Sequence, residues 1–196
     1  MILVITPETM VQNETDIINQ LFQEGLDLLH IRKPMISREE MKNFLYGIDE
    51  EFYSQLVLHG YDDLGKDHHI SRFHFRETDR NAGIYKSHVG KNILSTSVHG
   101  METYNALGKE WEYSFFSPVF PSISKKGYGE ELTVMGQIKY RANQNVKLIA
   151  LGGINESNIC KVFENGADGA ALLGAVWESD QPLNTFKRCR KNALSQ

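Results

Sequence analysis

The sequence predicts an α/β protein, a single-domain (β/α)8 TIM barrel in which some crossover helices are shortened. About eight short apolar segments, rich in branched residues, alternate with segments of helical periodicity. No linker, low-complexity tract or break in composition interrupts this pattern, so residues 1–196 are expected to form one domain. The chain is short for a barrel of this type, which is why trimmed crossover helices are expected.

Composition restricts the classes of function. The chain has 41% hydrophobic and 23% charged residues, which is typical of a soluble globular protein. A net charge of -4 argues against a general binder of nucleic acid or anionic membranes, although local basic clusters can still hold phosphate groups. Cys160 and Cys189 lack the spacing of a disulfide or zinc pair, and the apolar run at the N-terminus is too short for a signal peptide or a membrane span. A cytoplasmic protein is expected.

Apolar runs bounded by Gly, Pro or polar clusters predict the strands. They are residues 2–5, 26–32, 55–58, 72–75, 91–95, 113–116, 148–151 and 170–173. Helical spacing and capping signals predict the helices between them. In residues 13–24 an apolar face of Ile17, Ile18, Leu21 and Phe22 precedes a stop at Gly25, and Ser37 with Glu40 forms a capping box for a helix to about residue 51. The other expected helices are 62–69, 101–107, 132–141, 157–165 and 182–193.

Glycines follow the last two expected strands. Gly152 and Gly153 come directly after residues 148–151, and Gly174 comes after residues 170–173. Glycine lets the backbone approach a ligand closely, and in barrels of this type the loops after the last two strands commonly bind phosphate. A Gly-Gly pair by itself is more often only a tight turn. Two such loops after adjacent strands favour a phosphate site.

Donors of hydrogen bonds gather where the other strands end. Because barrel enzymes keep their sites at the C-terminal ends of the strands, these positions are candidates for ligand binding. They are His30, Arg32, Lys33, His59, Asp79, Ser97, His99, Ser122, Ser124, Lys125 and Lys126. Cations, hydroxyls and backbone N–H groups at one end of an acidic protein predict a site for two phosphate groups. Taken singly, His30 and His59 fit hydrogen-bonded core histidines better than ligand-binding residues, whereas Arg32 fits an ordinary surface charge equally well.

Several motifs together resemble thiamine phosphate synthase and its relative TenI, the aminothiazole tautomerase, over nearly the whole chain. The motifs are Gly152-Gly153-Ile154, Gly166-Ala167-Asp168-Gly169 with Gly174 in the following turn, Ser97-Val98-His99, and the loop from Ser117-Pro118 to Ser124-Lys125. The resemblance implies a barrel enzyme that binds a phosphorylated thiazole and an aminopyrimidine pyrophosphate. It implies catalytic roles for Arg32, Ser97 and Lys125 at the pyrophosphate. It implies substrate binding by His30, His59, Ser122, Ser124, Gly152, Gly153, Leu173 and Gly174.

The resemblance also implies a magnesium ion, and here the sequence departs from the synthase pattern. The synthase motif with glutamine, arginine and lysine after strand two is His30-Ile31-Arg32-Lys33-Pro34 in this chain. The carboxylate after strand three is replaced by Gly60, which leaves Asp79 as a possible metal ligand. His30 and Gly60 are more similar to TenI, whereas Pro118 stands where TenI has its catalytic histidine and is similar to a synthase.

Three readings follow from this mixture. The first is a thiamine phosphate synthase-like transferase, which joins the aminopyrimidine to the thiazole phosphate and releases pyrophosphate with the help of Mg²⁺. The alternatives are a TenI-like tautomerase and a non-catalytic phosphate-binding regulator. All three imply small phosphorylated ligands, with no nucleic acid or membrane partner, and leave a homo-oligomer possible.

Overall fold

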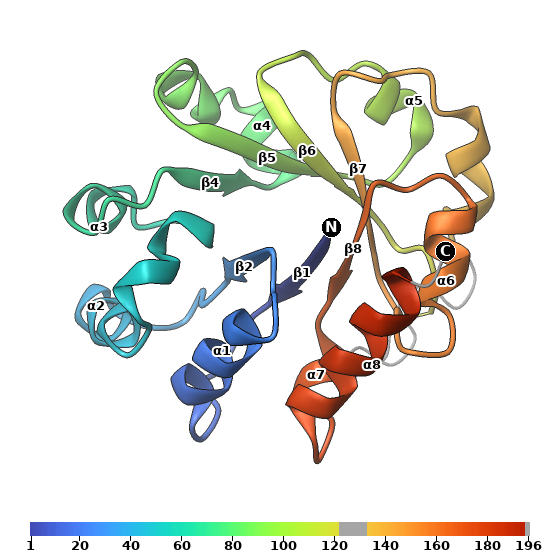
Figure 1. Ribbon diagram of the computed structural model, residues 1–196. Coiled ribbons are helices and arrows are strands. Elements are labelled where there is room, and N and C mark those ends of the chain that lie inside the picture. The colour runs from blue at the N-terminus through green and yellow to red at the C-terminus, as the bar shows by residue number, and fades with distance from the viewer. Residues whose placement is uncertain (122–132, 195–196) are drawn as a thin grey trace.

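The computed structural model describes residues 1–121 and 133–194, and its strands form a closed parallel barrel in chain order. The barrel closes where Leu3 of β1 pairs with Ala171 of β8. The strands are β1 Ile2–Ile5, β2 Leu28–Ile31, β3 Leu56–Leu58, β4 Arg72–Phe75, β5 Ile93–Val98, β6 Trp111–Phe116, β7 Lys147–Leu151 and β8 Gly169–Leu172. Figure 1 shows the strands in the middle of the molecule with the helices around them. The predicted fold class is confirmed.

The crossover helices are short, as the length of the chain predicts. The α-helices are α1 Glu14–Gln23, α2 Arg38–Tyr46, α3 Asp62–Asp67, α4 Glu77–Asn81, α5 Met101–Asn105, α6 Ile159–Glu164, α7 Gly174–Trp177 and α8 Pro182–Leu194. Three 3-10 helices complete the described part: η1 Glu50–Gln55, η2 Ile84–His88 and η3 Met135–Tyr140. The helix expected over residues 132–141 is therefore 3-10 in its described part. The described part of the chain contains no helix long and apolar enough to cross a membrane.

Local signals set most boundaries. The capping box forms as predicted, because the Ser37 hydroxyl accepts from the Glu40 N–H and the Glu40 carboxylate accepts from the Ser37 N–H. The helix nevertheless ends at Tyr46 rather than near residue 51, and the separate 3-10 helix η1 begins at Glu50. Strand β5 runs to Val98, three residues beyond the expected end, so Ser97 lies within the strand rather than after it.

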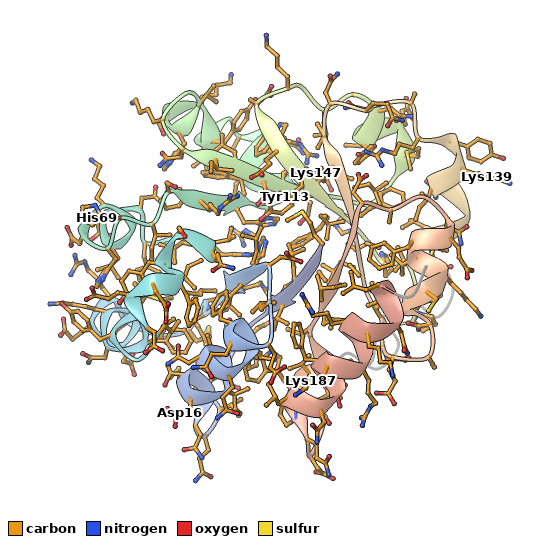
Figure 2. The ribbon with its side chains drawn as sticks, in the orientation of Figure 1. Asp16, His69, Tyr113, Lys139, Lys147 and Lys187 are labelled. Carbon is orange, nitrogen blue, oxygen red and sulfur yellow. The ribbon has the colours of Figure 1, made fainter. Side chains whose placement is uncertain are left out.

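Two layers of apolar side chains hold the barrel. The inner layer fills the space inside the strands, and the outer layer packs between the strands and the helices. The inner layer consists of Leu3, Ile5, Leu28, Val57, Tyr113, Phe115, Ile149 and Ala171. Figure 2 shows Tyr113 toward the middle of the barrel, whereas Asp16 and Lys187 lie on the outer helices α1 and α8. The inner layer closes the barrel below the C-terminal ends of the strands, where the site lies.

Candidate functional site

A cavity of about 600 Å³ opens at the C-terminal ends of the strands. Eight of the residues predicted for the site line it: Arg32, His59, Ser97, His99, Gly152, Gly153, Leu173 and Gly174. Their placement around one pocket agrees with the prediction, while their individual roles stay predictions. Three further predicted residues, Ser122, Ser124 and Lys125, lie outside the described residues, as does Lys126.

The two glycines after β7 have a structural reason as well. Both have positive φ, 109° at Gly152 and 62° at Gly153. A Cβ on Gly153 would lie 2.1 Å from the Pro121 carbonyl oxygen, and one on Gly152 would lie 2.9 Å from Pro118 Cβ. The chain after β6 thus crosses directly over this turn, and its Phe120 N–H donates to the Gly152 carbonyl oxygen at 3.1 Å. These glycines permit a close approach of the protein to itself, and they also lie on the pocket wall.

Arg32 and Lys33 follow β2 but turn to different places. Arg32 lines the pocket, and its guanidinium pairs with Glu8 at 2.6 Å on a partly exposed surface. Lys33 is 3% exposed, lies 2.7 Å from the Glu14 carboxylate and also donates to the Thr9 carbonyl oxygen at 2.8 Å. Lys33 therefore joins β2 to α1 inside the protein and does not replace the lysine that is missing from the synthase motif.

The described residues do not fit the magnesium site that the family resemblance implies. Gly60 offers no side-chain ligand, and Asp79 does not line the pocket. The two oxygens of Asp79 instead accept from the Arg76 guanidinium at 2.9 and 3.1 Å, an interaction that lowers the pKa of this carboxyl group. Among the described residues that line the pocket, only Glu77 has a carboxylate, and it pairs with Arg80 at 2.8 Å. Magnesium binding stays a prediction, but Asp79 is not a ready ligand for it.

A group of three histidines lies at the floor of the pocket, where His59 and His74 line it and His30 lies behind them. His30 is fully buried behind the pocket wall, so its predicted direct contact with substrate is corrected to a position in the layer below. Its Nδ1 lies 2.8 Å from His59 Nε2, and its Nε2 lies 2.8 Å from the Tyr113 hydroxyl. Desolvation by burial lowers the pKa of His30 and His59 well below the usual value and lowers that of His74 to about 3. The three imidazoles are therefore uncharged at neutral pH.

His74 is a site residue that the sequence analysis missed. It lies on β4, lines the pocket and forms hydrogen bonds with Ser95 and Ser97, each at 2.9 Å. Its position could have been predicted from the alternation of side chains along β4. Phe73 and Phe75 pack on the outer face of this strand, so His74 points toward the inside of the barrel. Arg76, directly after β4, was also missed. It lines the pocket, and its guanidinium is paired with Asp79.

His99 of the Ser-x-His motif also lines the pocket. Its Nδ1 lies 2.9 Å from the Ser117 carbonyl oxygen, where the chain leaves β6. The motif therefore joins the end of β5 to the start of the following loop. Ser117, at the beginning of that loop, is a further pocket residue.

Comparisons with known proteins agree with this geometry. A family model described as thiamine monophosphate synthase matches residues 2–176. A thiamine-phosphate synthase of Anoxybacillus flavithermus is 26% identical, over 84% of this chain and 72% of that protein. One of Dictyoglomus turgidum is 24% identical, over 90% of this chain and 80% of that protein.

A solved structure also resembles this chain. The thiamine phosphate pyrophosphorylase of Bacteroides thetaiotaomicron superposes with a TM-score of 0.81 at 26% identity, covering 100% of this chain and 98% of that one. The family model covers most of the chain, and both bacterial relatives carry the name of the synthase rather than of the tautomerase. The chain therefore belongs to the thiamine monophosphate synthase family, and it is a transferase of thiamine biosynthesis.

Proposed function

We propose that this chain joins an aminopyrimidine pyrophosphate to a thiazole phosphate, forming thiamine phosphate and releasing pyrophosphate. The observation that carries the proposal is the composition of the pocket at the C-terminal ends of the strands. Arg32 and Ser97 come from the β2 and β5 sides of this pocket, and the glycine turns come from β7 and β8. A volume of about 600 Å³ suits two small ring compounds held side by side.

The charges in the pocket suit departure of pyrophosphate. In the proposed step the carbon–oxygen bond to pyrophosphate breaks, the electron pair leaves with the oxygen, and the thiazole nitrogen forms the new carbon–nitrogen bond. The guanidinium groups of Arg32 and Arg76 and the Ser97 hydroxyl stabilise the negative charge that develops on the leaving group. Phosphate on the thiazole is expected against the turns at Gly153 and Gly174.

The other wall of the pocket suits the carbon centre, which becomes positive as pyrophosphate leaves. His59 and His74 line the pocket as uncharged imidazoles, and the Phe115 ring lies beside His74 with 5.0 Å between ring centroids. Neutral rings do not repel a cation, and the face of an aromatic ring attracts one. A charged histidine at either position would oppose the reaction.

The partners follow from the chemistry. The ligands are small phosphorylated molecules, and their charge prevents them from crossing membranes unaided, so we propose that the enzyme works in the cytoplasm where such precursors are made. No observation on the described residues favours isomerisation of a thiazole as a second activity.

Replacing Arg32 tests the proposal. The purified chain, given both precursors, is expected to form thiamine phosphate, and Arg32→Gln is expected to raise the KM for the aminopyrimidine pyrophosphate by roughly 10- to 100-fold. Arg38→Gln is the matched control, since Arg38 pairs with Asp63 on the surface and does not line the pocket. Equal KM values for the two variants would remove Arg32 from the site, and no product from the unmodified chain would refute the reaction.

A further inference from the structure

Three imidazoles converge at the floor of the pocket from consecutive strands. His30 lies on β2, His59 follows β3 and His74 lies on β4, and their ligand nitrogens are all within 4.8 Å of one another. Within residues 1–121 and 133–194 no other group of three His, Cys, Asp or Glu side chains comes together in this way. We propose that His30, His59 and His74 bind a divalent transition-metal ion, with Zn²⁺ the ion that best matches the donor set.

The distances require only a local movement. Zinc bound to imidazole nitrogens at about 2.0–2.1 Å in a tetrahedron separates the ligand nitrogens by about 3.3 Å. His30 Nδ1 and His59 Nε2 are already 2.8 Å apart, and the largest separation in the group closes by about 1.5 Å on binding. The rings of His59 and His74 are stacked with centroids 4.4 Å apart, so one of them turns to direct its nitrogen at the ion. His59 is only partly buried and borders the pocket, which leaves it space to turn.

The surroundings orient the ligands. Metal-binding imidazoles normally use their second nitrogen to hydrogen-bond a neighbouring group. The Tyr113 hydroxyl lies 2.8 Å from His30 Nε2, and the Ser95 hydroxyl lies 2.9 Å from His74 Nδ1. The bond to Tyr113 leaves His30 Nδ1 for the ion. In His74 the nitrogen for the ion is Nε2, which exchanges its present contact with the Ser97 hydroxyl at 2.9 Å for the metal. Because the imidazoles are uncharged, coordination needs a change of tautomer and no net loss of protons.

The donors select the kind of metal. Three nitrogens without a carboxylate suit Zn²⁺ and its transition-metal neighbours, whereas Mg²⁺ prefers oxygen ligands. Three histidines leave a fourth position open, as in catalytic zinc sites. His59 and His74 both line the cavity, so the fourth position faces it and takes an oxygen ligand from there. The metal site is complete without substrate. Because a bound ion places positive charge on the wall that faces the developing cation, the metal-loaded chain is expected to turn over more slowly than the metal-free chain.

The test is titration of the untagged, metal-free chain with Zn²⁺ alone, followed by calorimetry. One ion per chain is expected, and His30→Gln, His59→Gln and His74→Gln are each expected to weaken binding by about 100-fold. The control is His69→Asn, since His69 is exposed on the outside of the barrel and asparagine tolerates its positive φ of 55°. Circular dichroism shows whether each variant is folded, and His59→Gln, at a partly buried position, is the variant with least risk to the fold.

A second measurement identifies the donors. Co²⁺ in place of Zn²⁺ is expected to give visible bands of a nitrogen and oxygen environment, which disappear in folded His59→Gln. An intense sulfur-to-metal band in the near ultraviolet would show binding by cysteine and would overturn the assignment. The same conclusion follows if the unmodified chain takes up no Zn²⁺ at about 1 mM, or if His59→Gln binds Zn²⁺ as tightly as His69→Asn.

Discussion

Lys33→Met separates a structural lysine from a catalytic one. Lys33 lies next to Arg32 in sequence, yet its side chain pairs with Glu14 at 2.7 Å, and the two side chains are 0% and 1% exposed. Removing one member of a buried ion pair leaves the other charge without compensation, which costs about 3–5 kcal/mol. For a chain of this length that corresponds to a fall in Tm of roughly 6–20 °C.

The loss of stability in Lys33→Met is expected to grow as the pH rises. Burial raises the pKa of Glu14 above 4.5, and the hydrogen bond and charge of Lys33 act in the opposite direction. Without Lys33 the pKa of Glu14 rises further, so the carboxyl group is neutral in the folded variant over a wider range of pH. A carboxyl group whose pKa is raised in the folded state destabilises that state at high pH and not at low pH. The stability of Lys33→Met therefore falls furthest below that of the unmodified chain near pH 8, and the difference shrinks as the pH falls toward 5.

The assay combines thermal unfolding with steady-state kinetics. The double variant Glu14→Gln/Lys33→Met removes both charges, keeps an oxygen to accept from the Val11 N–H, and is expected to recover stability to within about 1 kcal/mol of the unmodified chain. The KM for the aminopyrimidine pyrophosphate is expected to be unchanged in the double variant. Full stability of Lys33→Met together with a raised KM would refute the reasoning, because it would place Lys33 at the substrate.

Three further predictions concern the pocket. Gly60→Asp is expected to raise the affinity for Mg²⁺ by at least about tenfold in calorimetry, because it adds a carboxylate after β3 whose Cβ has no atom within 4 Å. The φ of 145° at this position strains any side chain, so a loss of stability is expected as well. Unchanged affinity in the folded variant would contradict a role for this position in metal binding. Gly153→Ala is expected to lower the free energy of unfolding by about 2 kcal/mol or more, because its Cβ would overlap the Pro121 carbonyl oxygen. An unaltered midpoint of denaturant unfolding would contradict this packing. Phe115→Leu is expected to lower kcat several-fold with little change in KM, because it removes an aromatic ring from the pocket wall that faces the positive carbon centre of the aminopyrimidine. A change confined to KM would contradict that role.

The barrel was predictable because its signals are local. Apolar runs such as residues 2–5 and 148–151 stand out from polar surroundings, and the glycine at each sharp turn is visible in the sequence. The end of β5 was missed because Thr96 and Ser97, which follow the expected end at Ser95, are polar. Their hydroxyls are satisfied inside the barrel, Thr96 by the Phe75 carbonyl oxygen at 2.8 Å and Ser97 by His74. Such partners come from the neighbouring strand and cannot be read from the segment itself.

The site was predictable as a location and less so in its details. Arg32, Ser97 and the glycine turns line the pocket as their positions after or at the ends of strands indicate. The sequence alone also suggests Gly153→Asp as a test of phosphate binding, because it places a carboxylate where the phosphate is expected. The structure shows that this variant cannot separate phosphate binding from stability, since any side chain at Gly153 meets the Pro121 backbone. Whether a histidine lies in the pocket or behind it depends on the barrel's tilt and packing, and this information is not in the strand pattern.

The most direct test of the account is the rate of pyrophosphate release as the thiazole phosphate is titrated at a fixed concentration of the aminopyrimidine pyrophosphate. The account predicts that release depends on the thiazole phosphate and that each pyrophosphate is matched by one molecule of thiamine phosphate. Release that continues at the same rate without the thiazole phosphate, or no release with both precursors present, would contradict it.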